Sequence, residues 1–201
     1  MNYTPQDLKT NLYTYLLILH PDESVNEKIM EQKKYFAKKY ECPSCLYSKP
    51  HITLIKFFHL AAIESLCIRR INNFARGITP FPVQLNGFGS FPSHTIYFSV
   101  QTKNEIIDLV KSLRGLHLPL KIDKDFQPHF ITEPHITLAR KLLPWQFEQG
   151  WLQWHQQDFL AKFMVNEMTL LKRRDMKSKY QIVRNFCFEG KPEQVQQTLL
   201  F

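Results

Sequence analysis

Apolar residues along this chain alternate between strand-like and helix-like spacing. Residues 14–20 (TYLLILH) are almost continuously apolar and end at a proline, which predicts a buried strand. Residues 62–74 carry apolar positions at helical spacing and are followed closely by a glycine, as the end of a helix often is. Residues 81–91 begin with apolar residues at every second position, which is the alternation of a half-buried strand. The chain therefore mixes helices and strands throughout its length.

The order of the expected elements repeats. In chain order, the pattern predicts a strand at 14–20, a helix at about 22–40, a strand at 50–58, a helix at 62–74, strands at 81–91 and 93–101, a helix at 104–116, a strand at 134–140, a helix from 144, and strands at about 162–172 and 179–189. No linker-like stretch of Gly, Ser or Pro separates the two halves. We therefore expect an α+β fold in a single domain, residues 1–201. It would consist of two interleaved, pseudo-symmetric lobes (pseudo-repeats at about 14–89 and 95–172), each a mixed or antiparallel sheet flanked by helices, with an active cleft between them.

The pentapeptide Pro-His-Ile-Thr-Leu occurs at residues 50–54 and again at 134–138. A proline followed by a β-branched, apolar run favours an extended strand. Because side chains alternate along a strand, each copy should point its histidine and threonine to one face and bury its isoleucine and leucine on the other. We expect the two copies to face each other across the cleft. The polar residues that they would bring together are His51, Thr53, His135 and Thr137.

Two histidines on opposite sides of a phosphorus centre suit an in-line displacement. A free imidazole has a pKa of about 6.5, so at neutral pH one histidine can accept a proton while the other donates one. The threonine hydroxyls would hold the non-bridging phosphoryl oxygens. A metal site is the competing use of two histidines, but neither motif contains a carboxylate or cysteine to complete a ligand set. The motifs therefore predict acid–base chemistry with no metal and no cofactor.

Composition adds expectations about partner and compartment. The 201 residues carry a formal net charge of +8, which suits a polyanion such as RNA, although many basic proteins bind none. The first ten residues are polar, and no apolar run approaches the roughly 20 residues that span a bilayer. We expect a cytoplasmic monomer without membrane association. Cys42 and Cys45 have zinc-knuckle spacing, but one Cys-x-x-Cys pair alone is weak evidence for a zinc or redox site.

The doubled motif resembles the signature of the 2H phosphoesterase superfamily, in the branch of 2′-5′ RNA ligase-like cyclic phosphodiesterases. The similarity continues in FPVQLNGFGSF at 81–91, in HITLAR at 135–140, and in the late segments 165–171 and 180–188. It therefore covers nearly the whole chain. The first copy continues as Ile-Lys-Phe-Phe at 55–58, where many relatives carry Phe-Leu-Gly or a proline-rich segment. The family fold is a bilobal α+β structure with its cleft between the lobes, which agrees with the pattern above.

The resemblance also implies an activity and residue roles. Members hydrolyse 2′,3′-cyclic phosphates or related phosphodiesters of RNA ends or nucleotides, and some join RNA ends reversibly through 2′-5′ bonds. Carried over to this chain, His51 and His135 would be the catalytic pair, and Thr53 and Thr137 would bind the substrate phosphate. The alternatives are a 2′-5′ RNA ligase, an RNA-binding module without turnover, and a phosphodiesterase for a metabolite other than a nucleotide. The sequence does not assign the base to either histidine.

A second set of residues is a candidate for substrate contact: Tyr47, Phe130, Arg140 and Lys172. The two aromatic residues precede the motifs, where each would either stack on a base or pack in the core. Strand alternation predicts that Arg140 points to the face opposite His135, where an ion pair and a phosphate contact are equally reasonable. Lys172 begins the densest basic cluster, at a predicted turn that is either solvated or in contact with RNA. The other histidines, His20 among them, show no repeated spacing and are expected to be incidental.

Overall fold

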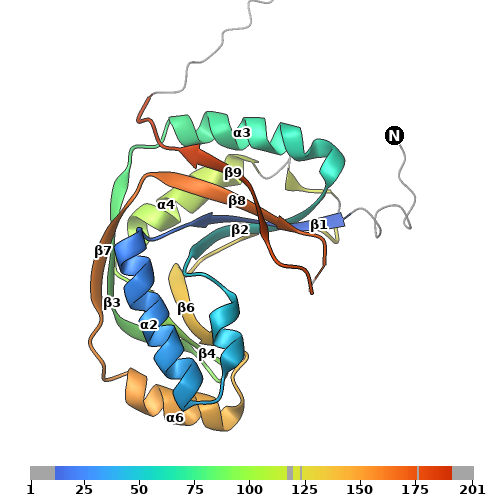
Figure 1. Ribbon diagram of the computed structural model, residues 1–201. Coiled ribbons are helices and arrows are strands. Elements are labelled where there is room, and N and C mark those ends of the chain that lie inside the picture. The colour runs from blue at the N-terminus through green and yellow to red at the C-terminus, as the bar shows by residue number, and fades with distance from the viewer. Residues whose placement is uncertain (1–11, 117–119, 123, 176, 192–201) are drawn as a thin grey trace, which may run out of the picture.

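The computed structural model describes residues 12–116, 120–122, 124–175 and 177–191, which form an antiparallel sheet with helices packed against it (Figure 1). The helical segments are α2 (Glu23–Lys39), η1 (Pro43–Tyr47), η2 (Ala61–Ile63), α3 (Glu64–Arg76), α4 (Lys103–Leu113), η3 (Arg114–Leu116) and α6 (Pro144–Trp154), where η marks a 3-10 helix. The strands are β1 (Leu12–Leu19), β2 (Ile52–Leu60), β3 (Phe81–Phe91), β4 (Thr95–Val100), β5 (His129–Phe130), β6 (His135–Arg140), β7 (Leu160–Val165), β8 (Glu167–Arg173) and β9 (Gln181–Cys187). The predicted α+β class is confirmed.

The two strands that carry the repeated motif are neighbours in this sheet. The strand order is β7-β3-β4-β6-β2-β1-β8-β9, and β5 pairs with the outer part of β2. The sheet thus has a β2 half (β2, β1, β8, β9) and a β6 half (β6, β4, β3, β7), which meet through one residue pair, Ile52 and Ile136. The motif strands therefore lie side by side and antiparallel, rather than on two separate sheets that face each other. A bilobal shape with a cleft between the lobes stays a prediction.

The chain crosses between the two halves after β2 and after β7, and it also returns to the β2 half at β5, which pairs with β2. Strand β3 follows α3 but pairs with β4 and β7 in the β6 half. The prediction of a single strand at about 162–172 is wrong. The segment is divided at Asn166 into β7 and β8, which lie in different halves of the sheet. The backbone carbonyl of Asn166 takes no part in strand pairing and instead accepts a hydrogen bond from the backbone N–H of Phe188. The terminal parts of the predicted domain, 1–11 and 192–201, lie outside the described residues.

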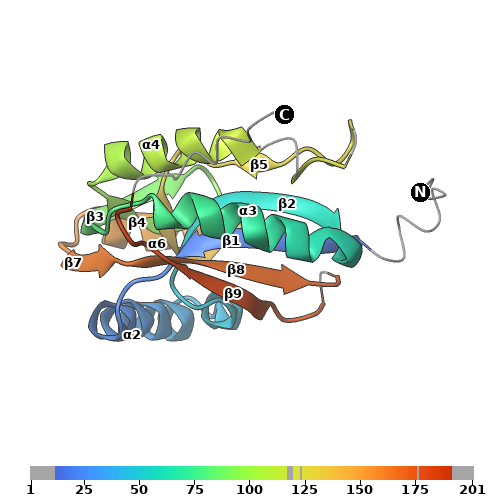
Figure 2. The same cartoon turned by 90° about the horizontal axis from the view of Figure 1, so that it is seen from above.

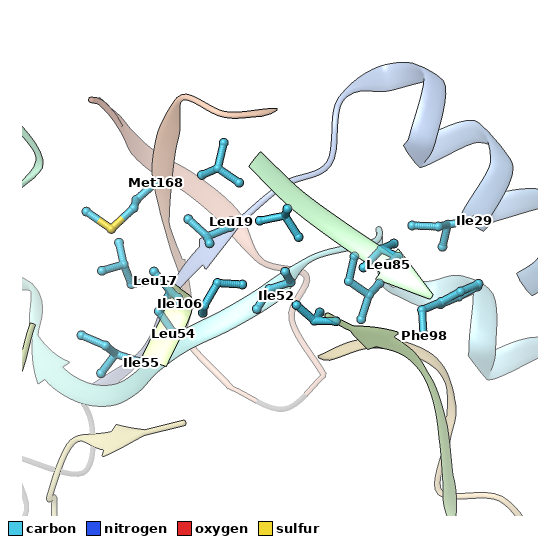
Figure 3. Close-up of a cluster of buried hydrophobic side chains, with 14 of the residues drawn as sticks. Leu17, Leu19, Ile29, Ile52, Leu54, Ile55, Leu85, Phe98, Ile106 and Met168 are labelled. Carbon is cyan, nitrogen blue, oxygen red and sulfur yellow. The ribbon is translucent and has the colours of Figure 1, made fainter. Parts of the chain in front are cut away.

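Different helices cover the apolar side of each half. Figure 2 shows α3 and α4 on one side of the molecule and α2 on the opposite side. On the β2 half, the hydroxyl of Tyr15 in β1 donates to Glu64 of α3, and Figure 3 shows Ile106 of α4 beside Leu17 and Leu54. Within the described ranges, no helix is long and apolar enough to cross a membrane.

Aromatic packing covers the β6 half. The ring of Trp154, at the end of α6, lies 5.7 Å from Phe36 of α2 and 4.9 Å from Phe88 of β3, centroid to centroid. Figure 3 places Ile52 between the residues around Leu17 and those around Phe98. The motif isoleucine is fully buried, so one continuous core fixes the point where the two motif strands meet.

Helix α2 is amphipathic with one exception. Its first turn is capped by the side chain of Asp22, which accepts a hydrogen bond from the backbone of Val25 at 2.9 Å. Apolar residues such as Ile29 and Phe36 form the stripe that packs against the sheet. Lys33 lies in the same stripe and is buried with them, which brings a cation into the interior close to the first motif.

Candidate active site

The two motif histidines have the same local geometry. The Nδ1 atom of His51 lies 2.7 Å from the carbonyl oxygen of Lys49, and Nδ1 of His135 lies 2.8 Å from the carbonyl oxygen of Glu133. In both copies the acceptor belongs to the residue before the motif proline, whose ring restricts the backbone on either side. A carbonyl oxygen only accepts, so Nδ1 must carry the proton. In the neutral form, Nε2 of each ring is then the nitrogen that can take a proton.

The predicted alternation along the motif strands is confirmed. Ile52, Leu54, Ile136 and Leu138 are fully buried, whereas the histidines and threonines are only partly buried. We call the side of the sheet that carries His51, Thr53, His135 and Thr137 the histidine face. Because β2 and β6 are antiparallel and pair at the two isoleucines, the register brings His51 toward Thr137 and Thr53 toward His135.

A β-bulge follows the threonine in each copy. The pairing of β2 with β1 skips Leu54, and the pairing of β6 with β4 skips Leu138. An extra residue in one strand reverses the alternation beyond it. Arg140 therefore lies on the histidine face, and the prediction that it points away from His135 is wrong.

Positive charge surrounds His51. Burial lowers the pKa of its imidazole to about 4, and the nearby basic groups of His20, Lys33 and Arg140 act in the same direction. The Lys49 carbonyl opposes the change by favouring the protonated ring, but burial dominates. His51 is therefore neutral at physiological pH.

Lys33 anchors the loop that precedes His51. Its side chain is almost completely buried, and its Nζ donates to the carbonyl oxygen of Ser48 at 2.7 Å and lies 3.4 Å from the Ser48 hydroxyl. Burial lowers the pKa of this amine to about 8. The lysine has neutral acceptors rather than a carboxylate, so its charge remains available to act on His51.

A carboxylate accompanies His135 instead. Burial lowers the pKa of His135, while the carbonyl and the carboxylate of Glu133 both act to raise it. The Glu133 carboxylate also forms an ion pair with Lys103, at the start of α4, with Nζ and Oε1 2.5 Å apart. The second histidine thus keeps an acidic partner that the first one lacks.

Two aromatic rings pack around His135. The centroid of Phe91 lies 5.0 Å from the imidazole in an edge-on arrangement, and that of Tyr97 lies 5.1 Å from it. Tyr97 is opposite Thr137 in the sheet register, so it stands on the histidine face. A glycine at position 89 permits this arrangement, because a Cβ there would come within 2.5 Å of the Tyr97 ring.

Comparison with known proteins identifies the family. A sequence model described as the 2′-5′ RNA ligase superfamily matches residues 21–177, which is more than half of the chain and includes both motifs. The chain belongs to this superfamily. The resemblance to the 2H phosphoesterases in their 2′-5′ RNA ligase-like branch is thereby confirmed.

Relatives and solved structures agree with this assignment. A Staphylococcus aureus (strain Newman) protein named "Putative phosphoesterase" is 25% identical over 174 residues, which cover 85% of this chain and 96% of the relative. The crystal structure of TT0787 of Thermus thermophilus matches with a TM-score of 0.63 at 20% identity, over 89% of this chain and 99% of that one. E. coli LigT complexed with 3′-AMP matches with a TM-score of 0.57 at 15% identity, over 89% and 98%. At these identities the two structures show a shared fold.

The remaining candidates for substrate contact, Tyr47, Phe130 and Lys172, lie in different parts of the molecule. Tyr47 is 84% exposed on η1, so it remains available to a substrate. Phe130 is buried in β5 with the guanidinium of Arg114 over its ring at 5.5 Å, so it packs in the core rather than in the site. Lys172 pairs with Glu64 of α3 at 2.7 Å, on the face of the sheet opposite the histidines. The suggested substrate contacts of Phe130 and Lys172 are therefore not supported by their positions.

Several neighbours of the histidines were not foreseen. His20, which the sequence suggested was incidental, places Nδ1 3.4 Å from the carbonyl oxygen of Pro50, and it is a basic group near His51 whose own pKa is lowered by burial. Lys33 and Tyr97 come from elements far from the motifs in sequence. Among the sequence features, only the lysine within the apolar stripe of α2 indicates that one of these residues is unusual.

The cysteine pair lies beside the first motif. Cys42 and Cys45 are both buried, and burial raises the pKa of the Cys45 thiol. Within the described residues, no three His, Cys, Asp or Glu side chains are grouped to hold a metal ion.

Proposed function

We propose that this protein hydrolyses 2′,3′-cyclic phosphates or related phosphodiester bonds of RNA ends or nucleotides, without a metal, by acid–base catalysis between His51 and His135. The observation that carries this proposal is the matched pair of Nδ1–carbonyl hydrogen bonds on neighbouring antiparallel strands. They leave two Nε2 atoms on one face of the sheet, and a phosphorus centre bound between them would have the base on one side and the acid on the other, as an in-line displacement requires. The 3′-AMP bound to LigT, a nucleotide with a 3′-phosphate, supports this class of substrate.

The surroundings of the two histidines support different roles for them. His51 is neutral at physiological pH and has positive charge around it, so it suits the general base. His135 has the Glu133 carboxylate nearby, and a bound phosphate would add a second negative charge that favours its protonated form. We therefore assign His135 as the general acid.

The reaction then proceeds in one displacement. Nε2 of His51 removes a proton from water as the water oxygen attacks phosphorus. The bond between phosphorus and one ribose oxygen breaks, and Nε2–H of His135 gives its proton to that oxygen. The hydroxyls of Thr53 and Thr137 donate hydrogen bonds to the non-bridging oxygens, which carry the developing charge. The same groups acting in reverse would join a hydroxyl to a cyclic phosphate, which is the ligase alternative.

A substrate panel in EDTA tests the proposal. It would contain 2′,3′-cyclic mononucleotides, RNA oligonucleotides with cyclic ends, and phosphodiesters without a nucleoside. We expect turnover of the cyclic nucleotides or cyclic ends to persist after exhaustive chelation. Loss of activity in EDTA that zinc or manganese restores would contradict the metal-free mechanism. Binding of RNA without turnover of any substrate would favour the binding-module alternative.

A further inference from the structure

Three rings at the second motif contact one another. The centroid of Phe91 lies 4.7 Å from that of Tyr97, and the two lie 5.0 Å and 5.1 Å from the imidazole of His135. Phe91 is nearly perpendicular to the imidazole, at 82°, whereas Tyr97 is tilted from it by 49°. We call Phe91 and Tyr97 the aromatic bracket. Because its two rings touch each other and meet the imidazole at different angles, they restrict how that ring can turn.

The bracket comes from the strands next to the motif, not from the repeat itself. Tyr97 of β4 is opposite Thr137 on one side and opposite Gly89 of β3 on the other. Phe91 is two residues from Gly89 on the same strand. Residues that are directly opposite, or two apart on one strand, share a face of the sheet. Both rings therefore stand on the histidine face beside His135.

The first histidine has no such support. Within the described part of the chain, no aromatic ring packs against His51. The loop before it is held instead by the hydrogen bond from Lys33 to the carbonyl of Ser48. The bracket is therefore specific to the second histidine.

Gly89 is required for space rather than for its backbone conformation. Its φ lies outside the left-handed region, yet a Cβ there would come within 2.5 Å of two carbon atoms of the Tyr97 ring and 2.7 Å of its hydroxyl oxygen. Gly87 is the reverse case, because its φ is 65° and a Cβ there would have no atom within 4 Å. The outer end of the Tyr97 ring thus lies against the main chain of β3 at a residue that has no side chain.

His135 needs such support because the hydrogen bond of its Nδ1 is a weak restraint by itself. The torsion that turns an imidazole about its Cβ–Cγ bond has broad minima related by a half turn. A single neutral hydrogen bond, such as that from Nδ1 to the carbonyl of Glu133, gives only a roughly five- to tenfold preference for one orientation. A half turn of the ring would break this bond and move Nε2 away from its place.

The ring of Tyr97, and not its hydroxyl, makes the contact with the imidazole. Within the described residues, the Tyr97 hydroxyl has no hydrogen-bond partner, although Lys103 and Glu133 both lie within electrostatic reach of it. A phenylalanine at this position would therefore keep what the bracket contributes.

We infer that Phe91 and Tyr97 are positioning residues for the general acid, holding the imidazole of His135 so that Nδ1–H meets the Glu133 carbonyl and Nε2 faces the leaving oxygen. Gly89 supplies the space that the Tyr97 ring occupies. This inference rests on the proposed function, which makes His135 the acid.

Replacing Tyr97 tests the inference by kinetics. Tyr97→Leu keeps an apolar side chain but removes the ring. We expect kcat on a 2′,3′-cyclic mononucleotide to fall about tenfold and KM to change less than about threefold, since misplacing a catalytic group by about 1 Å can cost up to about 100-fold in rate. Tyr97→Phe keeps the ring and should retain kcat within about twofold.

Replacing Gly89 tests the same geometry from the other strand. Gly89→Ala should displace the Tyr97 ring and lower kcat as Tyr97→Leu does. In the Tyr97→Leu background it should cause little further loss, because the atoms that the new Cβ would strike are gone. Gly87→Ala is the matched control: it strains the backbone of the same strand but touches no ring, so kcat should stay near the wild-type value.

Nitrogen-15 NMR of the His135 ring reads its tautomer without turnover. At about pH 8, above the free imidazole pKa of about 6.5, the wild-type ring should carry its proton on Nδ1. The same tautomer is expected in Tyr97→Phe and Gly87→Ala. Tyr97→Leu and Gly89→Ala should show shifts averaged between the two tautomers.

Unchanged kcat and tautomer in both Tyr97→Leu and Gly89→Ala would overturn the inference, as would additive losses in the double variant. A rise in KM at constant kcat would also overturn it, because the rings would then bind substrate. An equal loss in Tyr97→Phe would assign the effect to the hydroxyl. A wild-type protein with the Nδ1–H tautomer that turns over no cyclic phosphate would instead overturn the proposed function, and the NMR comparison would still test the bracket.

Discussion

The two copies of Pro-His-Ile-Thr-Leu have the same backbone and opposite electrostatic surroundings. Both histidines donate Nδ1–H to the residue before a proline, and both strands bulge at the motif leucine. His51, however, has three basic groups within electrostatic reach, whereas His135 has a carboxylate. The comparison shows that the repeat supplies equal geometry, while residues outside it create the difference in protonation that an acid–base pair needs.

The difference originates in how each preceding loop is anchored. A lysine of α2, Lys33, holds the loop before the first motif through the carbonyl of Ser48, and it keeps its charge unpaired in the interior. A lysine of α4, Lys103, meets the residue before the second motif proline, and there the carboxylate of Glu133 neutralises it. Each loop is thus held by a lysine from a helix. The first lysine keeps an unpaired charge near His51, whereas the second pairs with a carboxylate that lies near His135.

Removing either histidine should give the largest effect. His51→Ala and His135→Ala should each lower turnover by at least the roughly 10²–10⁴-fold typical of lost acid–base catalysis. The double variant should lose little more than the worse single variant, because both groups act in one transition state. Steady-state kinetics on each active substrate measures this. Near-normal turnover by both single variants would rule out the two-histidine mechanism.

The threonines should give a smaller effect that is nearly equal in the two copies. Replacing Thr53 or Thr137 by Val keeps the shape and removes a hydrogen bond to a charged oxygen, worth about 1.5–3 kcal/mol, so kcat should fall roughly 10- to 100-fold. The Ser variants, which keep the hydroxyl, should retain most of the activity. A loss confined to one copy would show that the phosphate is held from one strand only.

The sequence predicted those parts of the fold and site that depend on local pattern. The alternation around His51 and His135 was readable because each motif is a short strand whose apolar residues are buried. The fold class and most elements followed from periodicity, and β3 has the predicted bounds. These features depend on neighbours close in the chain, which the sequence displays directly.

Features that depend on strand pairing cannot be predicted from the local sequence pattern. Nothing local marks Leu54 and Leu138 as bulges, so strand alternation alone predicts the wrong face for Arg140. The apolar run around Asn166 concealed the crossing from one half of the sheet to the other, because β7 and β8 both read as buried strand. Lys33 and Tyr97 reach the histidines only through tertiary packing, so their roles could not be seen in the motif.

The smallest effect, and the most specific, concerns pH. With His51 as base and His135 as acid, kcat/KM should rise as His51 loses its proton near pH 4 and fall as His135 loses its own below about 6.5. The maximum should therefore lie on the acidic side of neutrality. Lys33→Met removes a cation near His51, so the pKa of His51 should rise and the acid limb should move to higher pH. Glu133→Gln removes an anion near His135, so the pKa of His135 should fall and the alkaline limb should move to lower pH.

Each shift should be about half a pH unit, or roughly 0.7 kcal/mol, and each should leave the other limb in place. Lys34→Met is the matched control, because Lys34 is the exposed neighbour of Lys33. Lys33→Met also deprives the Ser48 carbonyl of its donor, at a cost of about 1–3 kcal/mol in the free energy of unfolding. A loss of stability alone would not shift one limb of the pH profile of kcat/KM. NMR titration of the His51 ring measures its pKa directly and needs no turnover. If Lys33→Met and Glu133→Gln moved the same limb, or neither moved any, the unequal charges would not be what separates the base from the acid.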